Sequence, residues 1–393
     1  MNKNLFLTLS AFLFLFPLSG KATGTYRPET SVAGFIQLPG SGRQVYDFNP
    51  GWRFFKGDIS GAETVNFDDR SWEVVSTPHT VELMPAEASG CRNYQGPVWY
   101  RKHFIVPAET KGQRVSIHFE AAMGKQILYL NGKRIQEHIG GYLPFTLDLT
   151  TYGVQAGDSC LLAVFVDNSD DKSYPPGKRQ YTLDFTYHGG IYRDVWMIAK
   201  SPVAITDAID SQIVGGGGVF VHFDKISEKS AQVCVNTEVQ NENTRSESVI
   251  VETTLTDADG KIIRRISGKL SLQSGEKRII RQQMEVKNPK LWSPDTPYLY
   301  RVQSRLKKGN QSIDGGITRI GIRQAEFRGK DGFWLNGRPY EEPLIGANRH
   351  QDFAVVGNAV PNNIHWRDAK KLRDAGMKVI RNAHCPQDPA FMD

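Results

Sequence analysis

The last fifty residues contain two short apolar segments joined by a helical pattern, and this arrangement constrains the fold more than any other feature. Residues 344–350 and 378–380 are apolar runs whose polar residues gather at or just after the carboxyl end. Apolar residues between them stand three positions apart, at Trp366, Ala369, Leu372 and Ala375. Gly376 follows where a helix is expected to stop. Because parallel strands need such a crossover helix, the sequence predicts a β-α-β unit.

Polar residues cluster at the carboxyl ends of both predicted strands. They are Asn348, Arg349, His350, Arg381 and His384. In a (β/α)8 barrel the carboxyl ends of the strands face the active site, so these side chains would lie together at the mouth of the barrel. The spacing alone leaves a second interpretation open, in which they are solvated loop residues.

The N-terminus has the pattern of a secretory signal peptide over residues 1–22. Lys3 precedes an apolar run over 5–18, and Gly20 and Ala22 are small residues suited to cleavage. The run is shorter than the roughly 20 apolar residues that span a bilayer. No cysteine stands at the cleavage region to carry a lipid. We therefore expect an exported protein, periplasmic or extracellular, without a membrane anchor.

Charge and cysteine usage exclude several classes of protein. Without Lys3 and Lys21 the chain has 46 basic and 42 acidic residues, and the charges are interspersed. We therefore expect no nucleic-acid partner. The cysteines are Cys91, Cys160, Cys234 and Cys385, and their spacing is typical of neither a metal site nor a disulfide framework. A bridge from Cys91 to Cys160 and buried free thiols are the two alternatives, and no metal site is predicted.

Residues 44–200 show the alternation of β-branched and aromatic residues that is typical of strands. The clearest runs are 98–106, 114–120, 126–130, 160–167 and 191–199. Asn131-Gly132 predicts a two-residue hairpin turn, because both positions of such a turn need positive φ. Together these features predict a jelly-roll sandwich. Its aromatic residues would form either a sugar-stacking face or, as we favour, the core: Trp52, Phe54, Trp72, Trp99, Tyr100 and Trp196.

Residues 203–325 continue the alternation in a second all-β region. Its clearest runs are 219–223, 232–240, 248–256, 277–285 and 298–306. Residues 215–218 are four glycines that indicate a turn-rich segment, and Asp257-Ala258-Asp259-Gly260 indicates a loop without the full calcium-binding pattern. The region is predicted to be a two-sheet sandwich of the immunoglobulin-like kind.

An ordered set of motifs in all three regions resembles glycoside hydrolase family 2. The set includes Gly189-Gly190-Ile191-Tyr192-Arg193-Asp194, Leu291-Trp292-Ser293-Pro294, and Asn348-Arg349-His350 with Val379-Ile380-Arg381-Asn382-Ala383-His384. The Asn-Arg-His triplet resembles the β-galactosidases within that family. The resemblance implies a sugar-binding jelly roll over 44–200, an immunoglobulin-like sandwich over 203–325, and the start of a TIM-barrel catalytic domain over 326–393.

The family's chemistry is retaining hydrolysis of a β-glycosidic bond by two glutamates about 5 Å apart. These glutamates come from later barrel strands, so we expect no catalytic residue in this chain and no activity from it alone. Glu341 and Glu342 precede the first strand and would lie at the wrong end of the barrel. The resemblance implies the N-terminal part of a β-galactosidase acting on terminal β-galactosides. A β-glucuronidase, a β-mannosidase or a non-catalytic carbohydrate-binding sandwich are the alternatives.

The resemblance also implies roles for four residues in binding a carbohydrate substrate. His350 and His384 would donate hydrogen bonds to sugar hydroxyls, and Arg381 would stabilise the nucleophile carboxylate. Asp184 matches an aspartate that touches the sugar and a bound cation in β-galactosidases. This chain is expected to require no cofactor, although the family allows a Na⁺ or Mg²⁺ ion in the complete enzyme and assembly as a homo-oligomer. Cys385 stands where the family commonly has tyrosine.

Overall fold

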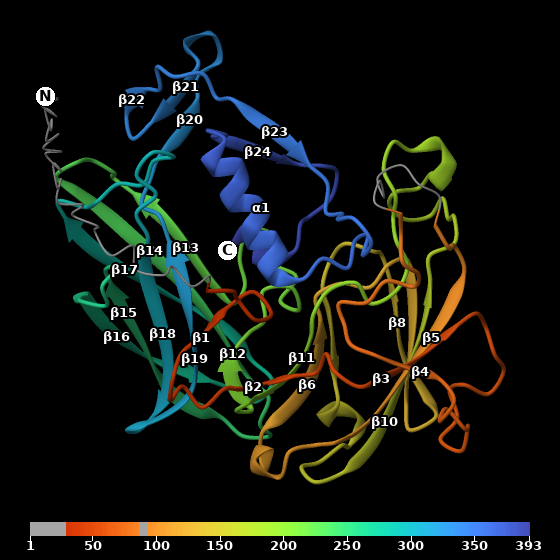
Figure 1. Cartoon of the computed structure of the whole chain (residues 1–393). Helices are drawn as coiled ribbons and strands as arrows, with labels where there is room; N and C mark the ends of the chain where they lie inside the picture. Colours follow the sequence, from red (N-terminus) through yellow and green to blue (C-terminus); the bar gives the residue numbers. More distant parts are fainter. Residues whose placement is uncertain (1–28, 86–92) are drawn as a thin grey trace, which may run out of the picture.

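A computed structural model describes residues 29–85 and 93–393, which form two β-sandwiches followed by a small β/α unit (Figure 1). The predicted signal peptide and Cys91 lie outside the described residues. None of the helices in the described part of the chain has the length and apolar character needed to cross a membrane. The thiols of Cys160, Cys234 and Cys385 are free.

The first sandwich consists of two antiparallel sheets. One has the order β4 (Glu73–Val75), β3 (Trp52–Lys56), β5 (Pro97–Ile105), β10 (Ser159–Asp167), β7 (Lys125–Leu130) and β8 (Lys133–Ile139). The other has the order β2 (Gln44–Asp47), β11 (Val195–Lys200), β6 (Arg114–Phe119) and β9 (Phe145–Asp148). Short 3-10 turns lie at Ala108–Thr110, Thr150–Tyr152 and Gln180–Thr182. Asn131 and Gly132, both with positive φ, form the predicted turn between β7 and β8.

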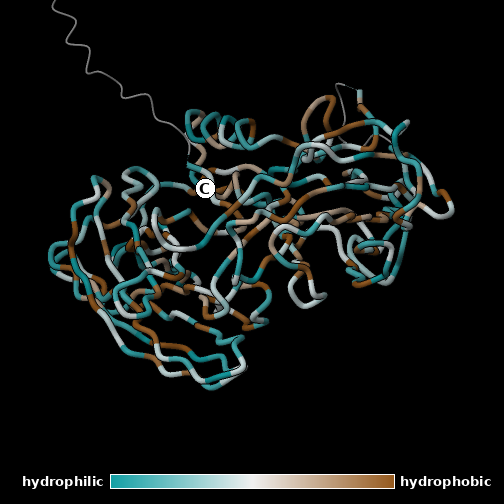
Figure 2. The backbone as a smooth tube through the Cα atoms, turned by 90° about the horizontal axis from the view of Figure 1, so that it is seen from below, coloured by the Kyte–Doolittle hydropathy of each residue, from teal (hydrophilic) through white to brown (hydrophobic). Residues whose placement is uncertain are grey.

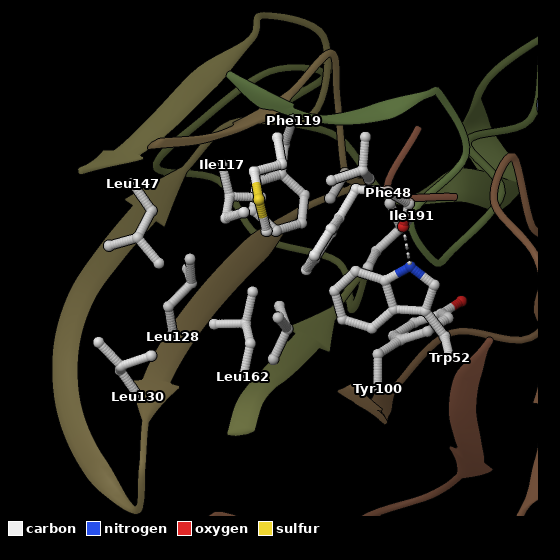
Figure 3. Close-up of a cluster of buried hydrophobic side chains, with 14 of the residues drawn as sticks. Phe48, Trp52, Tyr100, Ile117, Phe119, Leu128, Leu130, Leu147, Leu162 and Ile191 are labelled. Atoms are coloured by element: carbon white, nitrogen blue, oxygen red, sulfur yellow. Dashed lines mark hydrogen bonds between the residues drawn. The ribbon is translucent and has the colours of Figure 1, made fainter. Parts of the chain in front are cut away.

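The core of this sandwich comes from the alternate residues that each sheet turns toward the other (Figure 3). Trp52, Tyr100 and Phe119 are completely buried there, and the Trp52 indole N–H donates to the Phe48 carbonyl at 3.1 Å. Of the six aromatics in question, Trp52, Phe54, Trp72, Trp99 and Tyr100 are buried and Trp196 is half-buried. Trp52, Phe54 and Tyr100 therefore belong to the sandwich core, as expected, whereas Trp72 and Trp99 are buried in a separate apolar cluster.

The second sandwich also consists of two antiparallel sheets. One has the order β1 (Ile36–Gln37), β19 (Gln311–Ile320), β18 (Tyr300–Lys308), β15 (Glu247–Thr256) and β16 (Ile262–Leu272). The other has the order β12 (Val203–Ile205), β14 (Ser230–Asn241) and β13 (Val219–Asp224), with β17 (Lys277–Lys287) also paired to β14. Strand β1 precedes the first sandwich in the chain yet pairs with β19, so the N-terminal segment ties the two sandwiches together. Figure 2 shows brown and teal alternating along many strands, as one-sided burial requires.

The β/α unit follows a small sheet of β20 (Ala325–Phe327), β21 (Phe333–Leu335) and β22 (Arg338–Pro339), with a 3-10 turn at Gly329–Asp331. It consists of β23 (Gly346–Arg349), α1 (Asn362–Asp374), β24 (Val379–Asn382) and α2 (Pro389–Met392). Strands β23 and β24 pair in parallel, which confirms the predicted β-α-β unit and the fold class as a whole. Helix α1 begins at Asn362, four residues before Trp366, where the predicted apolar spacing begins, and Gly376 adopts a positive φ just after its end.

Candidate functional site

Three aromatic rings meet at the carboxyl ends of β23 and β24. His350 directly follows β23 and His384 lies two residues after β24, and their ring centroids are 5.3 Å apart. The third ring, Phe185, comes from a loop of the first sandwich and lies 5.9 Å from His350 and 5.4 Å from His384. We call these three residues the ring cluster. His350 and His384 were predicted from the sequence. The cluster combines these two residues of the β/α unit with Phe185 of the first sandwich.

Arg381 lies at the same end of the strand pair. It is exposed on β24 and stands opposite Asn348 in the parallel register. One guanidinium nitrogen donates to the Asn348 side-chain oxygen at 3.4 Å, which is a long hydrogen bond. The cation is therefore weakly held by this neighbour and remains exposed.

Asp184 is exposed and immediately precedes Phe185 in the chain. Its carboxylate could contribute one oxygen to a Na⁺ or Mg²⁺ ion. Among the described residues, the only group of three or more His, Cys, Asp or Glu side chains close enough to share an ion lies on β13 and β14. The described part of the chain thus does not supply a full acidic ligand set at Asp184, and we assign no step to an ion there.

Phe185 is the member of the ring cluster that sequence reasoning missed. It stands between Asp184 and Thr186 in a loop, outside any strand pattern. The one available signal in the sequence was an aromatic residue directly after Asp184, which the family resemblance had already singled out. Only the packing of the first sandwich against the β/α unit places its ring beside the two histidines.

Arg349 does not face the mouth, so its predicted position there was wrong. Its side chain is buried, and its guanidinium donates to Gln387 at 2.6 Å, His365 at 2.9 Å and Asp368 at 3.0 Å. The guanidinium also lies 4.0 Å from the centroid of the Phe391 ring. Because a buried cation needs such partners, Arg349 turns toward α1 and α2 and fixes β23 against them.

The partner histidine of Arg349 is neutral. His365 is completely buried, and burial, followed by the nearby Arg349 and Arg193 cations, lowers its pKa to about 3. A neutral imidazole can accept the hydrogen bond that Arg349 donates through Nδ1. The apolar spacing predicted that α1 turns a face inward that carries Trp366, Ala369, Leu372 and Ala375. The fully buried residue of the helix is instead His365.

Buried polar contacts join the β/α unit to the first sandwich, and we call them the polar junction. The Arg193 guanidinium donates to the Gln351 side chain at 2.8 Å and to the Pro386 carbonyl at 2.7 Å. The His188 backbone N–H donates to the Asn358 side chain at 2.8 Å. The Asn362 amide, at the start of α1, donates to the Asp194 carboxylate at 2.8 Å. Through these contacts, the segment that carries Phe185 is held against the segments that carry His350 and His384.

Neither Glu341, Glu342 nor Cys385 belongs to the ring cluster. Glu342 forms an ion pair with Lys378, which directly precedes β24, so Glu342 lies at the amino end of that strand, opposite the ring cluster. Lys378 also pairs with Asp295 at 2.7 Å. Glu341 is exposed. Cys385 is half-buried, and burial raises the pKa of its thiol, so it is not an activated nucleophile.

Two β-sandwiches thus lead into a β/α unit whose carboxyl strand ends carry aromatic and polar side chains. The chain matches the sugar binding domain of glycosyl hydrolases family 2 over residues 55–202, a further model named glycosyl hydrolases family 2 over 217–323, and the TIM barrel domain of the same family over 327–393. The chain belongs to glycoside hydrolase family 2.

Individual relatives carry two different names. The chain is 32% identical to a β-glucuronidase of Formosa agariphila, covering 91% of this chain and 37% of that protein. It is 33% identical to a β-galactosidase of Thermoanaerobacter pseudethanolicus, covering 90% of this chain and 45% of that protein. A structure of Bacteroides uniformis β-glucuronidase 2, covalently bound to cyclophellitol-6-carboxylate aziridine, superposes with a TM-score of 0.79 at 31% identity, covering 89% and 40% of the two chains. The chain thus spans roughly two-fifths of the length of these relatives.

Proposed function

We propose that this chain forms the two N-terminal sandwiches and part of the sugar-binding wall of a retaining β-glycosidase that removes terminal β-galactosyl residues from oligo- or polysaccharides. The observation that carries the proposal is the ring cluster at the carboxyl ends of β23 and β24. In a (β/α)8 barrel this is the end at which substrates bind. Membership of the family supplies the reaction class.

The residues of the wall suit a sugar ring. An imidazole can donate to one hydroxyl and accept from another, so His350 and His384 can orient a polyhydroxylated ring. The Phe185 ring offers an apolar surface to the C–H face of the same sugar, as the aromatic lining of ligand sites commonly does. Arg381 supplies an exposed cation that can hold a catalytic carboxylate by a charge-assisted bond.

We assign the acid/base and the nucleophile to none of this chain's residues. Retaining hydrolysis needs two carboxyl groups about 5 Å apart across the scissile bond. Glu342 is bound to Lys378 at the other end of β24. We therefore propose that the 393-residue chain alone turns over no glycoside, because binding residues cannot replace the missing proton transfer and covalent chemistry.

A β-glucuronidase is the second candidate, and it is favoured by the names of several relatives and by the carboxylate in the ligand of the superposed structure. A glucuronide differs from a galactoside by a charged carboxylate at C6 and by the orientation of its C4 hydroxyl, and the carboxylate would need a cation or hydrogen-bond donors nearby. The two candidates therefore differ in the preferred substrate and not in the reaction class.

The experiment compares the purified chain with an extended form that carries a complete barrel. Both are assayed on nitrophenyl β-galactoside and nitrophenyl β-glucuronide. We expect turnover by the extended form only, with the larger kcat/KM on the galactoside. A larger value on the glucuronide would decide for the second candidate. Turnover by the short chain that is abolished by His384→Ala would overturn the assignment of the catalytic carboxylates.

We further propose that the protein is exported, on the basis of the pattern in residues 1–22. Expression in a bacterial host with an intact secretion system should yield a chain that lacks these residues. Intact-mass measurement of the protein in the periplasmic or culture fraction tests this. A full-length chain confined to the cytoplasm would exclude it.

A further inference from the structure

Three metal-ligating side chains lie together on the second sandwich. His222 and Asp224 stand on β13 and Cys234 stands on β14. One ligand atom from each of the three residues lies within 4.8 Å of the other two. None of the three belongs to the ring cluster or to the polar junction.

The strand register explains how the three residues meet. His222 and Cys234 are direct partners across the antiparallel pair, and Asp224 follows two positions later, diagonal to Cys234. Residues two apart in a strand share a face, and both direct and diagonal cross-strand neighbours can interact. Val221 and Phe223 pack into the apolar core of the sandwich, so the three ligands occupy the opposite face of this sheet. The expectation of no metal site came from residue spacing along the chain, in the cysteines and in Asp257-Ala258-Asp259-Gly260, and such spacing does not include strand pairing.

The local contacts indicate that a ligand belongs here. Cys234 is buried, and its thiol donates to a carboxylate oxygen of Asp224 at 3.3 Å. The Nδ1 atom of His222 is buried and has no hydrogen-bond partner among the described residues. A buried polar atom without a protein partner is one that an ion or a water can satisfy. The Phe220 ring lies nearly parallel to the imidazole, with 5.8 Å between the ring centroids.

We propose that His222, Asp224 and Cys234 bind a Zn²⁺ ion, with water as the fourth ligand. A thiolate, an imidazole and a carboxylate form a donor set that suits zinc, whereas Ca²⁺ and Mg²⁺ prefer oxygen ligands alone. Zinc bonds of about 2.0–2.3 Å in a tetrahedron place ligand atoms roughly 3.3–3.8 Å apart. The sulfur-to-oxygen distance of 3.3 Å already lies in this range. The remaining distances between ligand atoms are at most 4.8 Å.

Binding replaces one interaction with another and releases one proton. The S–H bond of Cys234 breaks, its proton passes to solvent, and the sulfur electron pair forms the Zn–S bond. The S–H···O contact with Asp224 is replaced by a Zn–O bond. The ion would join β13, which pairs only with β14 among the described strands, to the centre of its sheet. Its role is thus to fix an edge strand, and it takes no part in glycoside hydrolysis.

The test measures zinc binding to the purified, reduced chain. Zinc is titrated in competition with a chromophoric chelator, and cobalt(II) serves as a spectroscopic probe because a cobalt–thiolate bond absorbs in the near ultraviolet. We expect one ion per chain and a thiolate band. Cys234→Ala should remove the band, and both Cys234→Ala and His222→Ala should weaken zinc binding at least a hundredfold. Asp224→Asn should weaken it less, because the amide oxygen remains a neutral donor.

Two matched variants control for nonspecific binding. Cys160→Ala removes another buried thiol, and His138→Ala removes another histidine with a buried, unpartnered ring nitrogen. Both should bind zinc as the parent chain does, and far-ultraviolet circular dichroism should show every variant folded. Zinc should also raise the Tm of the parent chain but not that of folded Cys234→Ala. The absence of zinc binding by the folded parent chain, or binding unchanged in Cys234→Ala, would refute the site.

Discussion

The first sandwich and the β/α unit are held in place by opposite kinds of side chain. In the sandwich, the completely buried residues are mainly apolar, such as Phe119, Leu128 and Leu162, and they come from the strands themselves. In the β/α unit, several strand residues are exposed, including Val379 at 41%, while many of the buried residues are polar. The buried polar residues are Arg349, Gln351, Asn358, His365, Gln387 and Asp388.

Buried apolar side chains and buried polar side chains thus contribute to the structure in different ways. Apolar burial stabilises the sandwich in rough proportion to the area removed from water, without directional demands. The polar contacts around Arg193 contribute less free energy in total, but they fix the orientation of the β/α unit. Loss of one hydrogen-bond partner leaves another buried polar group unpaired. The β/α unit therefore depends on the sandwich for its position, and the ring cluster depends on both.

The largest effect is expected in the apolar core of the sandwich. Phe119 is completely buried and stacks on Phe145 at 4.7 Å between centroids. Phe119→Ala should lower the free energy of unfolding by about 3–5 kcal/mol, from lost burial and the cavity left behind. Phe327→Ala is the matched control, because Phe327 is 81% exposed and should change stability by less than about 0.5 kcal/mol. Urea unfolding measures both, and equal effects would contradict the assigned core.

A smaller and local effect is expected at the polar junction. Arg193→Met removes the donors to Gln351 and Pro386 but keeps an unbranched side chain in their place. It should lower the opening free energy of residues 350–390 by about 3 kcal/mol, or roughly a hundredfold in amide exchange. Hydrogen exchange resolved by segment measures this, with strands β5 and β10 as the internal reference.

Arg179→Met is the control for that measurement, because Arg179 is an exposed arginine of the same sandwich. It should leave exchange over 350–390 unchanged. Limited proteolysis of Arg193→Met should also cut the chain after residue 323, either before residue 346 or within the β/α unit, and should leave both sandwiches intact. Global loss of protection in Arg193→Met would mean that the sandwich and the β/α unit unfold as one.

The sequence predicts the sandwiches well where alternation is uninterrupted. The predicted run over 98–106 became β5 (Pro97–Ile105), and the run over 160–167 became β10 (Ser159–Asp167). Strand β16 (Ile262–Leu272) was missed because most of its residues are exposed and it carries several charges, so it lacks a continuous apolar face. Strand β1 could not be predicted, because its partner β19 lies almost 300 residues away.

The candidate site could be predicted from the sequence only in part, because contacts between distant segments place some of its residues. His350, Arg381 and His384 follow from the position of residues along a strand, which a sequence pattern can indicate. The inward turn of Arg349 depends on acceptors on α1 and near α2, and the place of Phe185 depends on how two domains pack. Contacts of this kind have no local period, so sequence patterns do not indicate them.

The polar junction should also depend on pH. Burial raises the pKa of Asp194 from an ordinary 3.8 to about 6. The nearby Asp388 and Asp47 charges act in the same direction, whereas hydrogen bonds from Asn362 and Asn49 act against it. Between these values the folded protein holds a proton that the unfolded chain has lost. The free energy of unfolding therefore falls as pH rises through this window.

Asp194→Asn cannot ionise and isolates this contribution. Relative to the variant, the parent chain should lose about 2 kcal/mol between about pH 4.5 and 6.5. Urea unfolding at several pH values measures the difference. Burial also raises the pKa of Glu120 and Asp388, so both proteins keep a falling background, and only the difference reports Asp194. Parallel curves would show that Asp194 is ionised throughout.

The smallest effect on stability is expected at the wall of the site, where the effect on activity should be large. Arg381 and His384 are exposed, so replacing either with alanine should change the Tm of the chain very little. In an extended form with a complete barrel, loss of a hydrogen bond to a charged or transition-state group costs about 1.5–3 kcal/mol, so kcat/KM should fall roughly tenfold to a hundredfold or more. Arg373→Ala, an exposed arginine near the end of α1, is the control and should leave kcat/KM unchanged. If Arg381→Ala and His384→Ala behave like this control, the two residues are solvated side chains at the strand ends and the wall lies elsewhere.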